Sequence, residues 1–168
     1  MKVLANHVLR DHVLIGGVAA LFVIPRLGLA GAFAFWIATV LVDSDHYLDY
    51  LIRSGFKKPG VGAMFRFHEE IFARCHQEGF LSLEIFHTLE FLVLFAWFAF
   101  HFGGLLPAIF WGMIFHMLVD LVHGARFGIL TKRSHSFVEY FLRRKWLIAQ
   151  GKDPGTAFRE ALVAAGCV

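Results

Sequence analysis

The sequence predicts an all-α integral membrane bundle of about four transmembrane or re-entrant helices, with a cytoplasmic loop and an interfacial C-terminal helix. Three observations predict this fold class. Hydrophobic residues make up 58% of the chain and charged residues only 17%, against roughly 25% charged residues in a typical soluble domain. Four apolar runs lie between residues 13 and 122. Histidine and carboxylate side chains recur near one end of each run.

The chain length of 168 residues favours a single membrane domain over 1–168. Within it we expect a helical core over 1–125 and a tail over 126–168. Met1 is followed by polar residues before the first apolar run. We therefore expect this run to be retained as an anchor and not cleaved as a signal peptide.

The first two apolar runs are Val13–Ile24 and Leu27–Val42. Each is shorter than the roughly 20 residues that a helix needs to cross a bilayer. Proline interrupts helices, so we expect the tight connection between the two runs at Pro25. The pair either crosses the membrane or forms a re-entrant hairpin that dips into it and returns.

A polar segment over 50–80 separates these runs from the next two, and we expect a surface helix over Phe65–Gln77 within it. The third run, Leu81–Phe102, is long enough to span as one helix. Gly103 and Gly104 then predict a turn before the fourth run, Leu105–Val122.

The tail is predicted to contain two helices. Ser136 followed by Glu139 is a capping-box pattern that favours a helix start. The helix that follows has apolar residues and a basic patch at 143–145, which is typical of a helix lying on an anionic leaflet. Asp153 and Pro154 resemble the N-cap and first residue of a last short helix.

Charge distribution predicts the orientation. If all four runs cross, every Lys and Arg except Arg26 lies on the side that holds the N-terminus, the 43–80 segment and the tail. By the positive-inside rule this side is cytoplasmic, and we expect an inner-membrane protein with both termini in the cytoplasm. Membrane lipids are the expected partners, a homo-oligomer is compatible with this topology, and the modest net charge of +3 gives no indication of nucleic-acid binding.

In this topology the histidines and carboxylates near the cytoplasmic ends of the runs lie at one depth. Taken singly, each pair is explained equally well without any function, as a structural hydrogen bond or a solvated helix end. Ionisable groups inside a membrane, however, are functional by default. Imidazoles and carboxylates that project from facing helices are how bundles build metal sites. We predict a site for one or two divalent ions, zinc or manganese, with the following ligands: His12, Asp43, Asp45, His46, His87, His116 and Asp120.

Such a site predicts hydrolysis by a metal-activated water. Glu90 or Glu84 is the candidate general base, because an apolar surround raises the pKa of a carboxyl group. A phospholipid or a lipid-linked phosphate ester would suit the membrane location, with Arg53, Lys57 and Lys58 holding its head group. His68 and His76 are predicted to be exposed, and His101 lies at the opposite end of the bundle.

The same residues resemble the YdjM-like family of inner-membrane metal-dependent hydrolases. That family has an N-terminal His-x-x-x-Gly, a Pro-Asp-x-Asp-His box, a Thr-His-Ser box and a His-x-x-x-Asp box. The corresponding segments here are His12–Gly16, Val42–His46, Phe86–Thr88 and His116–Asp120, with Val42 in place of the proline and Phe86 in place of the threonine. The resemblance covers most of the chain up to Val122 and implies a metal-dependent hydrolase.

Two other classes stay open. Membrane di-iron oxygenases and desaturases also bind metal at the cytoplasmic mouth of a helical bundle, but their His-x-x-x-His and His-x-x-His-His boxes do not occur in this sequence. A non-enzymatic metal-binding membrane protein is the second alternative. A transporter would need polar residues through the whole membrane depth, whereas the other half of each run here is Leu, Phe and Ala.

Overall fold

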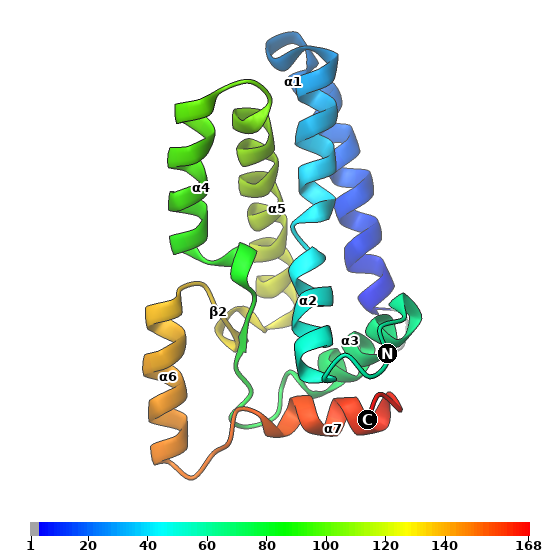
Figure 1. The fold of residues 1–168 in the computed structure, drawn as a ribbon, viewed down its shortest axis with the longest axis vertical. Coiled ribbons are helices and arrows are strands. Elements are labelled where there is room, and N and C mark those ends of the chain that lie inside the picture. The colour runs from blue at the N-terminus through cyan, green and yellow to red at the C-terminus, as the bar shows by residue number, and fades with distance from the viewer. Residues whose placement is uncertain (1–3) are drawn as a thin grey trace.

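The computed structural model describes residues 4–168, with side chains from Arg10 onward. The chain is mostly helical, as predicted, with one short pair of parallel strands that the sequence did not predict (Figure 1). The α-helices are α1 (Leu4–Leu41), α2 (Ser44–Arg53), α3 (Val61–Arg74), α4 (Leu89–Phe102), α5 (Leu106–Phe127), α6 (Phe137–Ala149) and α7 (Thr156–Ala164). The shorter elements are β1 (Ser82–Leu83), η1 (Ile85–His87), η2 (Leu130–Lys132) and β2 (Arg133–Ser134).

Helix α1 contains the first two apolar runs and reverses its direction between them (Figure 1). The break lies at Gly28, with φ of 66°, where we predicted it at Pro25. Glycine has no Cβ and adopts a positive φ at little cost, whereas Pro25 is accommodated inside the helix. The two arms then pack against each other, and the Trp36 indole Nε1 donates to the Val13 carbonyl over 3.0 Å.

Helices α4 and α5 form the second antiparallel pair, connected through Gly103 and Gly104. The prediction of a single helix over Leu81–Phe102 is wrong. Residues 82–87 form β1 and η1, and α4 starts only at Leu89, where the Thr88 side chain caps it by accepting from the Phe91 amide. His87 therefore lies just before α4 and not within a helix that covers Leu81–Phe102.

The two chain reversals lie at one end of the bundle, at the top of Figure 1, and the 43–88 segment and the tail lie at the other. This agrees with the predicted order of the four runs. Within the described residues, Arg10–Arg53 and Leu106–Phe127 are helical stretches long and apolar enough to cross a membrane, and Leu89–Phe102 is an apolar but shorter helix.

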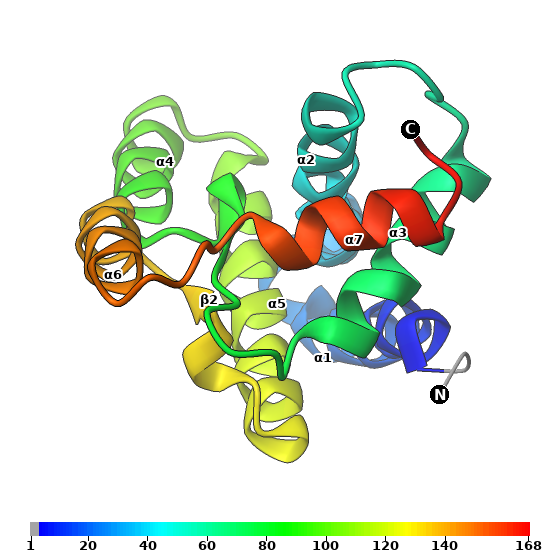
Figure 2. The ribbon, with the colours of Figure 1, turned by 90° about the horizontal axis from the view of Figure 1, so that it is seen from below.

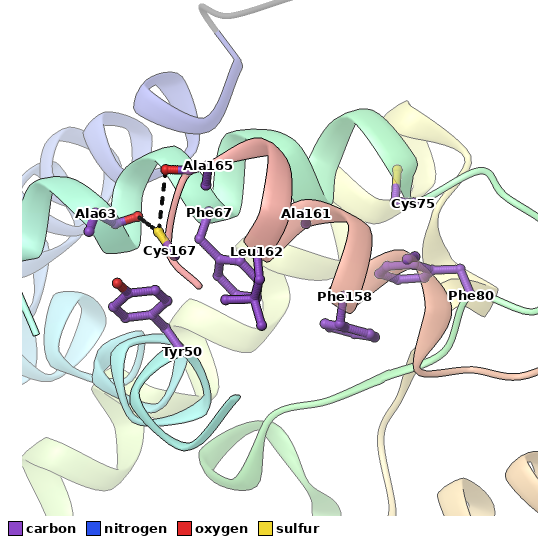
Figure 3. Packing of buried hydrophobic residues seen from close by; sticks show 11 residues of the cluster. Tyr50, Ala63, Phe67, Cys75, Phe80, Phe158, Ala161, Leu162, Ala165 and Cys167 are labelled. Atoms are coloured by element: carbon purple, nitrogen blue, oxygen red, sulfur yellow. Dashed lines mark hydrogen bonds between the residues drawn. The ribbon is translucent and has the colours of Figure 1, made fainter. Parts of the chain in front are cut away.

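Helices α3 and α7 lie across the lower end of the bundle (Figure 2). They share an aromatic core that includes Tyr50, Phe67 and Phe158, so the tail packs directly on the 50–80 segment (Figure 3). Cys167 is buried in this core near the Ala63 carbonyl, and both cysteines are free thiols. The last helix starts at Thr156, later than predicted, because Asp153 caps the Gly155 amide ahead of it.

Helix α6 starts at the predicted capping box, where the Ser136 hydroxyl accepts from the Glu139 amide. The prediction that this helix lies on a leaflet stays a prediction. In Figures 1 and 2 it runs along the same direction as α4, below it. Its apolar residues Val138, Phe141, Leu142 and Trp146 are exposed, so they extend the exposed apolar surface of α4.

A close approach between α5 and the second arm of α1 gives a test of this packing. A Cβ at Gly112 would overlap the Phe35 carbonyl oxygen and lie 2.8 Å from the Ala38 Cβ. We expect Gly112→Ala to lower the free energy of unfolding by about 1–3 kcal/mol through overpacking, measured by denaturation in detergent. Gly17→Ala is the matched control, since its Cβ meets the Trp36 ring at ordinary contact distances, the nearest atom being Nε1 at 3.4 Å. Equal stability of both variants would contradict this helix packing.

Candidate metal centre

Four donor side chains from three parts of the chain meet at the lower end of the bundle. Asp43 lies between α1 and α2, His87 ends η1, and His116 and Asp120 project from one face of α5. Both histidines are fully buried, and the two aspartate side chains are 19% and 12% exposed. We call these four residues the metal centre.

The donor atoms of the metal centre are spaced as the ligands of one ion would be. The Asp43 Oδ1 lies 3.4 Å from the His116 Nε2 and 3.6 Å from the His87 Nε2. The Asp120 Oδ2 lies 3.6 Å and 3.5 Å from the same two nitrogens. With metal–ligand bonds of about 2.0–2.2 Å, donors at tetrahedral angles lie about 3.3–3.6 Å apart. The spacing of each carboxylate oxygen from the two imidazole nitrogens therefore matches that of ligands to a shared ion.

Both imidazole rings are oriented by a second hydrogen bond. The His116 Nδ1 lies 2.8 Å from the Thr39 carbonyl oxygen, which can only accept, so this nitrogen donates. The His87 Nδ1 lies 2.9 Å from the Asp45 Oδ2, which also accepts from the Phe86 amide. Asp45 was predicted as a ligand, but the structure places it behind His87, where it orients the ring, as carboxylates do for metal-binding histidines.

These hydrogen bonds show that the centre suits a cation. With both Nδ1 atoms protonated, neutral His87 and His116 present unprotonated Nε2 atoms, and these lie only 3.0 Å apart. Two nitrogen lone pairs at this distance repel unless a proton or a metal ion lies between them. The carboxylates of Asp43, Asp45, Asp120 and Glu84 are offset among the described residues of the cluster by one guanidinium, that of Arg133. Buried negative charge of this kind favours a bound cation.

His12 and His46 flank the metal centre. The fully buried His12 lies between its two aspartates, with Nδ1 3.3 Å from the Asp43 Oδ2 and Nε2 3.2 Å from the Asp120 Oδ1. The His46 Nε2 lies 3.4 Å from the Asp43 Oδ1. The structure therefore brings every predicted ligand to one cluster, with Asp45 in a supporting position.

Arg133, which was not predicted, ties the cluster to the tail. The parallel pairing of β1 with β2 brings it beside Glu84, to which its Nε donates over 2.8 Å, and its Nη1 donates to Asp120. Burial alone would raise the pKa of Glu84, but the charges of Arg133 and His46 outweigh it and lower this pKa below its usual value. The prediction that an apolar surround raises the pKa of this carboxyl group is wrong.

Glu90, the other candidate base, lies outside the cluster. Its carboxylate accepts hydrogen bonds from the Ser136 hydroxyl and the Val138 amide at the start of α6. It therefore holds α6 against α4, which is a structural position and not one that faces the predicted ligands.

A cavity of about 420 Å³ opens beside the cluster, within the usual size range for small-molecule sites. Most of its walls are apolar, with Phe65, Phe72 and Phe127 among them. Its polar residues gather at the cluster, and they include Asp43, His46, Glu84, Asp120, His123 and Arg133.

The cations predicted to hold a head group do not line this cavity. Arg53 pairs with Asp49 and covers the Phe158 ring at 3.7 Å, and Lys57 and Lys58 are exposed. Lys132 and Arg133 line the cavity instead. Pairing between β1 and β2 brings this segment of the tail to the site, and no local sequence pattern predicts that pairing.

His68 was predicted to be exposed, but it is half-buried and lines the cavity, whereas His76 is exposed as predicted. Burial, together with the charge of His46, lowers the pKa of His68 to about 4. Its Nδ1 donates to the Met64 carbonyl over 3.0 Å. The burial of His68 was predictable from the helical spacing of Met64, Phe67 and Ile71 around it. These apolar residues lie on the inner face of α3.

Comparisons of the chain with protein-family models, with curated proteins and with solved structures give no match.

Proposed function

We propose that this protein is a membrane-embedded, metal-dependent hydrolase that cleaves a phosphate ester attached to an apolar group. One observation supports this proposal above all: a cluster of histidine and carboxylate side chains that could hold a metal ion contributes Asp43 and Asp120 to the wall of a mostly apolar cavity. The resemblance of the four sequence boxes to the YdjM-like family points to the same reaction class.

The membrane location rests on how the apolar helices are exposed. Phe22 is 80% exposed and Leu29 76% exposed on α1, and Trp97 on α4 is 63% exposed. The core helix of a soluble protein buries such residues, whereas a lipid-facing helix presents them outward. Among the described residues, every Lys and Arg except Arg26 belongs to segments at the end that holds the metal centre. We infer that this end faces the cytoplasmic leaflet.

The ligand set of two imidazoles and two carboxylates favours zinc or manganese over calcium, which prefers oxygen ligands alone. A divalent ion held by these residues would supply a Lewis acid and a nucleophilic water near neutral pH. Asp45 and the Thr39 carbonyl hold the two imidazoles in the tautomer that binds a metal. Arg133 holds Asp120 in place and neutralises part of the charge beside it.

Glu84 and His68 line the cavity and are the candidate proton acceptors of the reaction. Glu84 stays ionised because Arg133 lowers its pKa, and its Oε1 lies 4.0 Å from the His46 Nδ1. His68 is a neutral imidazole whose Nε2 is free to accept, since Nδ1 donates to Met64. The aromatic walls would take the apolar part of the substrate and exclude water around the scissile bond.

The proposal is tested with full-length protein purified in detergent, stripped with a chelator and reloaded with Zn²⁺ or Mn²⁺. We expect release of inorganic phosphate from phosphatidic acid in mixed micelles, and at least tenfold slower release from glycerol phosphate, which has no apolar group to fill the cavity. The chelated protein is the control and should be inactive. A metal-loaded protein that hydrolyses neither substrate would contradict the hydrolase. Retention of iron with a visible absorption band would favour an oxygenase.

A further inference from the structure

We propose that a second divalent ion binds beside the metal centre, held by His12, Asp120 and His123 and sharing Asp120 with the first ion. The proposal rests on the metal centre described above and adds His123 as a ligand. His123 lies three residues after Asp120 on α5, close to one turn further along the same face. His12 reaches the same point from the first arm of α1.

The donor atoms of these three residues lie within 4.8 Å of one another. Asp120 presents a different oxygen to each site. Its Oδ2 lies 3.5 Å from the His87 Nε2, and its Oδ1 lies 3.2 Å from the His12 Nε2. A carboxylate that offers one oxygen to each of two neighbouring groups of ligands is placed to bridge two ions.

Two buried nitrogen atoms of this group make no hydrogen bond of acceptable geometry, although the first of them lies 3.2 Å from the Asp120 Oδ1. They are the His12 Nε2 and the His123 Nδ1. His12 is only 1% exposed, so water does not satisfy its Nε2. A buried polar atom that makes no hydrogen bond is destabilising, and a bound cation would remove that cost at both atoms.

The other nitrogen of each ring faces a carboxylate, which sets the tautomer that a metal needs. The His12 Nδ1 lies 3.3 Å from the Asp43 Oδ2 and donates to it. The His123 Nε2 lies 3.4 Å from the Asp11 Oδ2. Protonation on these sides leaves lone pairs on the His12 Nε2 and the His123 Nδ1, the same two atoms that make no hydrogen bond. Asp11 and Asp43 are then positioning residues for the second ion.

The location of this second site also suits a substrate. Asp120 and His123 both line the cavity, and three protein ligands leave a coordination position open for an incoming group. Paired ions about 3.5–4 Å apart stabilise both the attacking and the leaving oxygen when phosphate esters are cleaved. Two ions would also offset more of the carboxylate charge that Arg133 leaves unpaired.

The test is the number of ions bound per chain in full-length protein reloaded with Mn²⁺ and freed of excess metal. We expect two ions in the wild type and one in His123→Ala, while the matched control His101→Ala, exposed at the far end of α4, keeps two. One ion in both the wild type and His123→Ala would overturn the second site and leave the metal centre intact. No bound ion in the wild type would overturn the metal centre and the second site together.

If His123→Ala fails to fold, a measurement on the wild type alone tests the second site. Two Mn²⁺ ions that share a carboxylate are exchange-coupled, so the six-line electron paramagnetic resonance signal of isolated Mn²⁺ is lost when both sites fill. We expect that loss between one and two equivalents of added Mn²⁺. A signal of isolated ions that persists with two ions bound would overturn the shared Asp120.

Discussion

Replacing His116 by alanine is expected to weaken metal binding at the metal centre by at least 100-fold. The His116 Nε2 lies within 3.6 Å of three other donor atoms, and its ring is fixed by the Thr39 carbonyl. Loss of a residue that only orients a ligand costs about 10–100-fold in metal affinity, so loss of the ligand itself should cost more. Competition with a fluorescent chelator measures the dissociation constant, and the metal content per chain gives an independent value.

Asp43→Ala should behave like His116→Ala, since the Asp43 carboxylate faces His87 and His116 with one oxygen and His12 with the other. His76→Ala is the control, because this residue is exposed on the turn after α3. It should bind metal as the wild type does. Unchanged affinity in both Asp43→Ala and His116→Ala would show that the ion binds elsewhere.

The second large effect is expected from Arg133→Met, which should lower the free energy of unfolding by about 3–5 kcal/mol. Methionine keeps most of the length of the side chain but removes the charge. Glu84 and Asp120 would then be left as partly buried carboxylates without their cation, and removal of one partner from a buried ion pair costs about this much. Denaturation is measured in detergent with a chelator present, because bound metal would add its own stabilisation.

Arg144→Met is the matched control, because Arg144 is exposed on α6 and surface substitutions usually change stability by less than about 0.5 kcal/mol. Adding Glu84→Gln to Arg133→Met should recover part of the loss, since one uncompensated carboxylate is removed. Stability of Arg133→Met within about 0.5 kcal/mol of the wild type would mean that the ion pairs with Glu84 and Asp120 contribute little.

Most of the candidate centre was predictable because its residues recur at corresponding ends of the apolar runs. In an antiparallel bundle the ends of all helices on one side meet, so His12, Asp43, His87 and His116 had to approach one another. Their roles were less predictable. Asp43 and Asp45 are close in sequence, yet Asp43 faces the other donors and Asp45 turns to His87 and the Phe86 amide. That difference depends on where α1 ends and α2 starts.

The errors in the fold came from segments whose conformation depends on distant partners. The third apolar run has the composition of a spanning helix. Its first residues nevertheless adopt an extended strand conformation, because Ser82 and Leu83 pair with Arg133 and Ser134. The reversal of α1 occurs at Gly28 and not at Pro25, because the backbone at this break has a positive φ, which glycine adopts readily and proline cannot. His68 lines the cavity because α3 packs with this face toward the core.

By itself, the sequence determined the helical class, the four apolar segments and the end of the bundle at which histidines and carboxylates gather, because hydrophobic periodicity and side-chain chemistry are local properties. The tertiary structure alone decided which donors share one point, that Arg133 neutralises Glu84 and Asp120, and that an apolar cavity opens beside them. These features depend on contacts between residues far apart in the chain, such as β1 with β2. The free energy of such contacts depends on the folded arrangement, so it cannot be inferred from the local sequence.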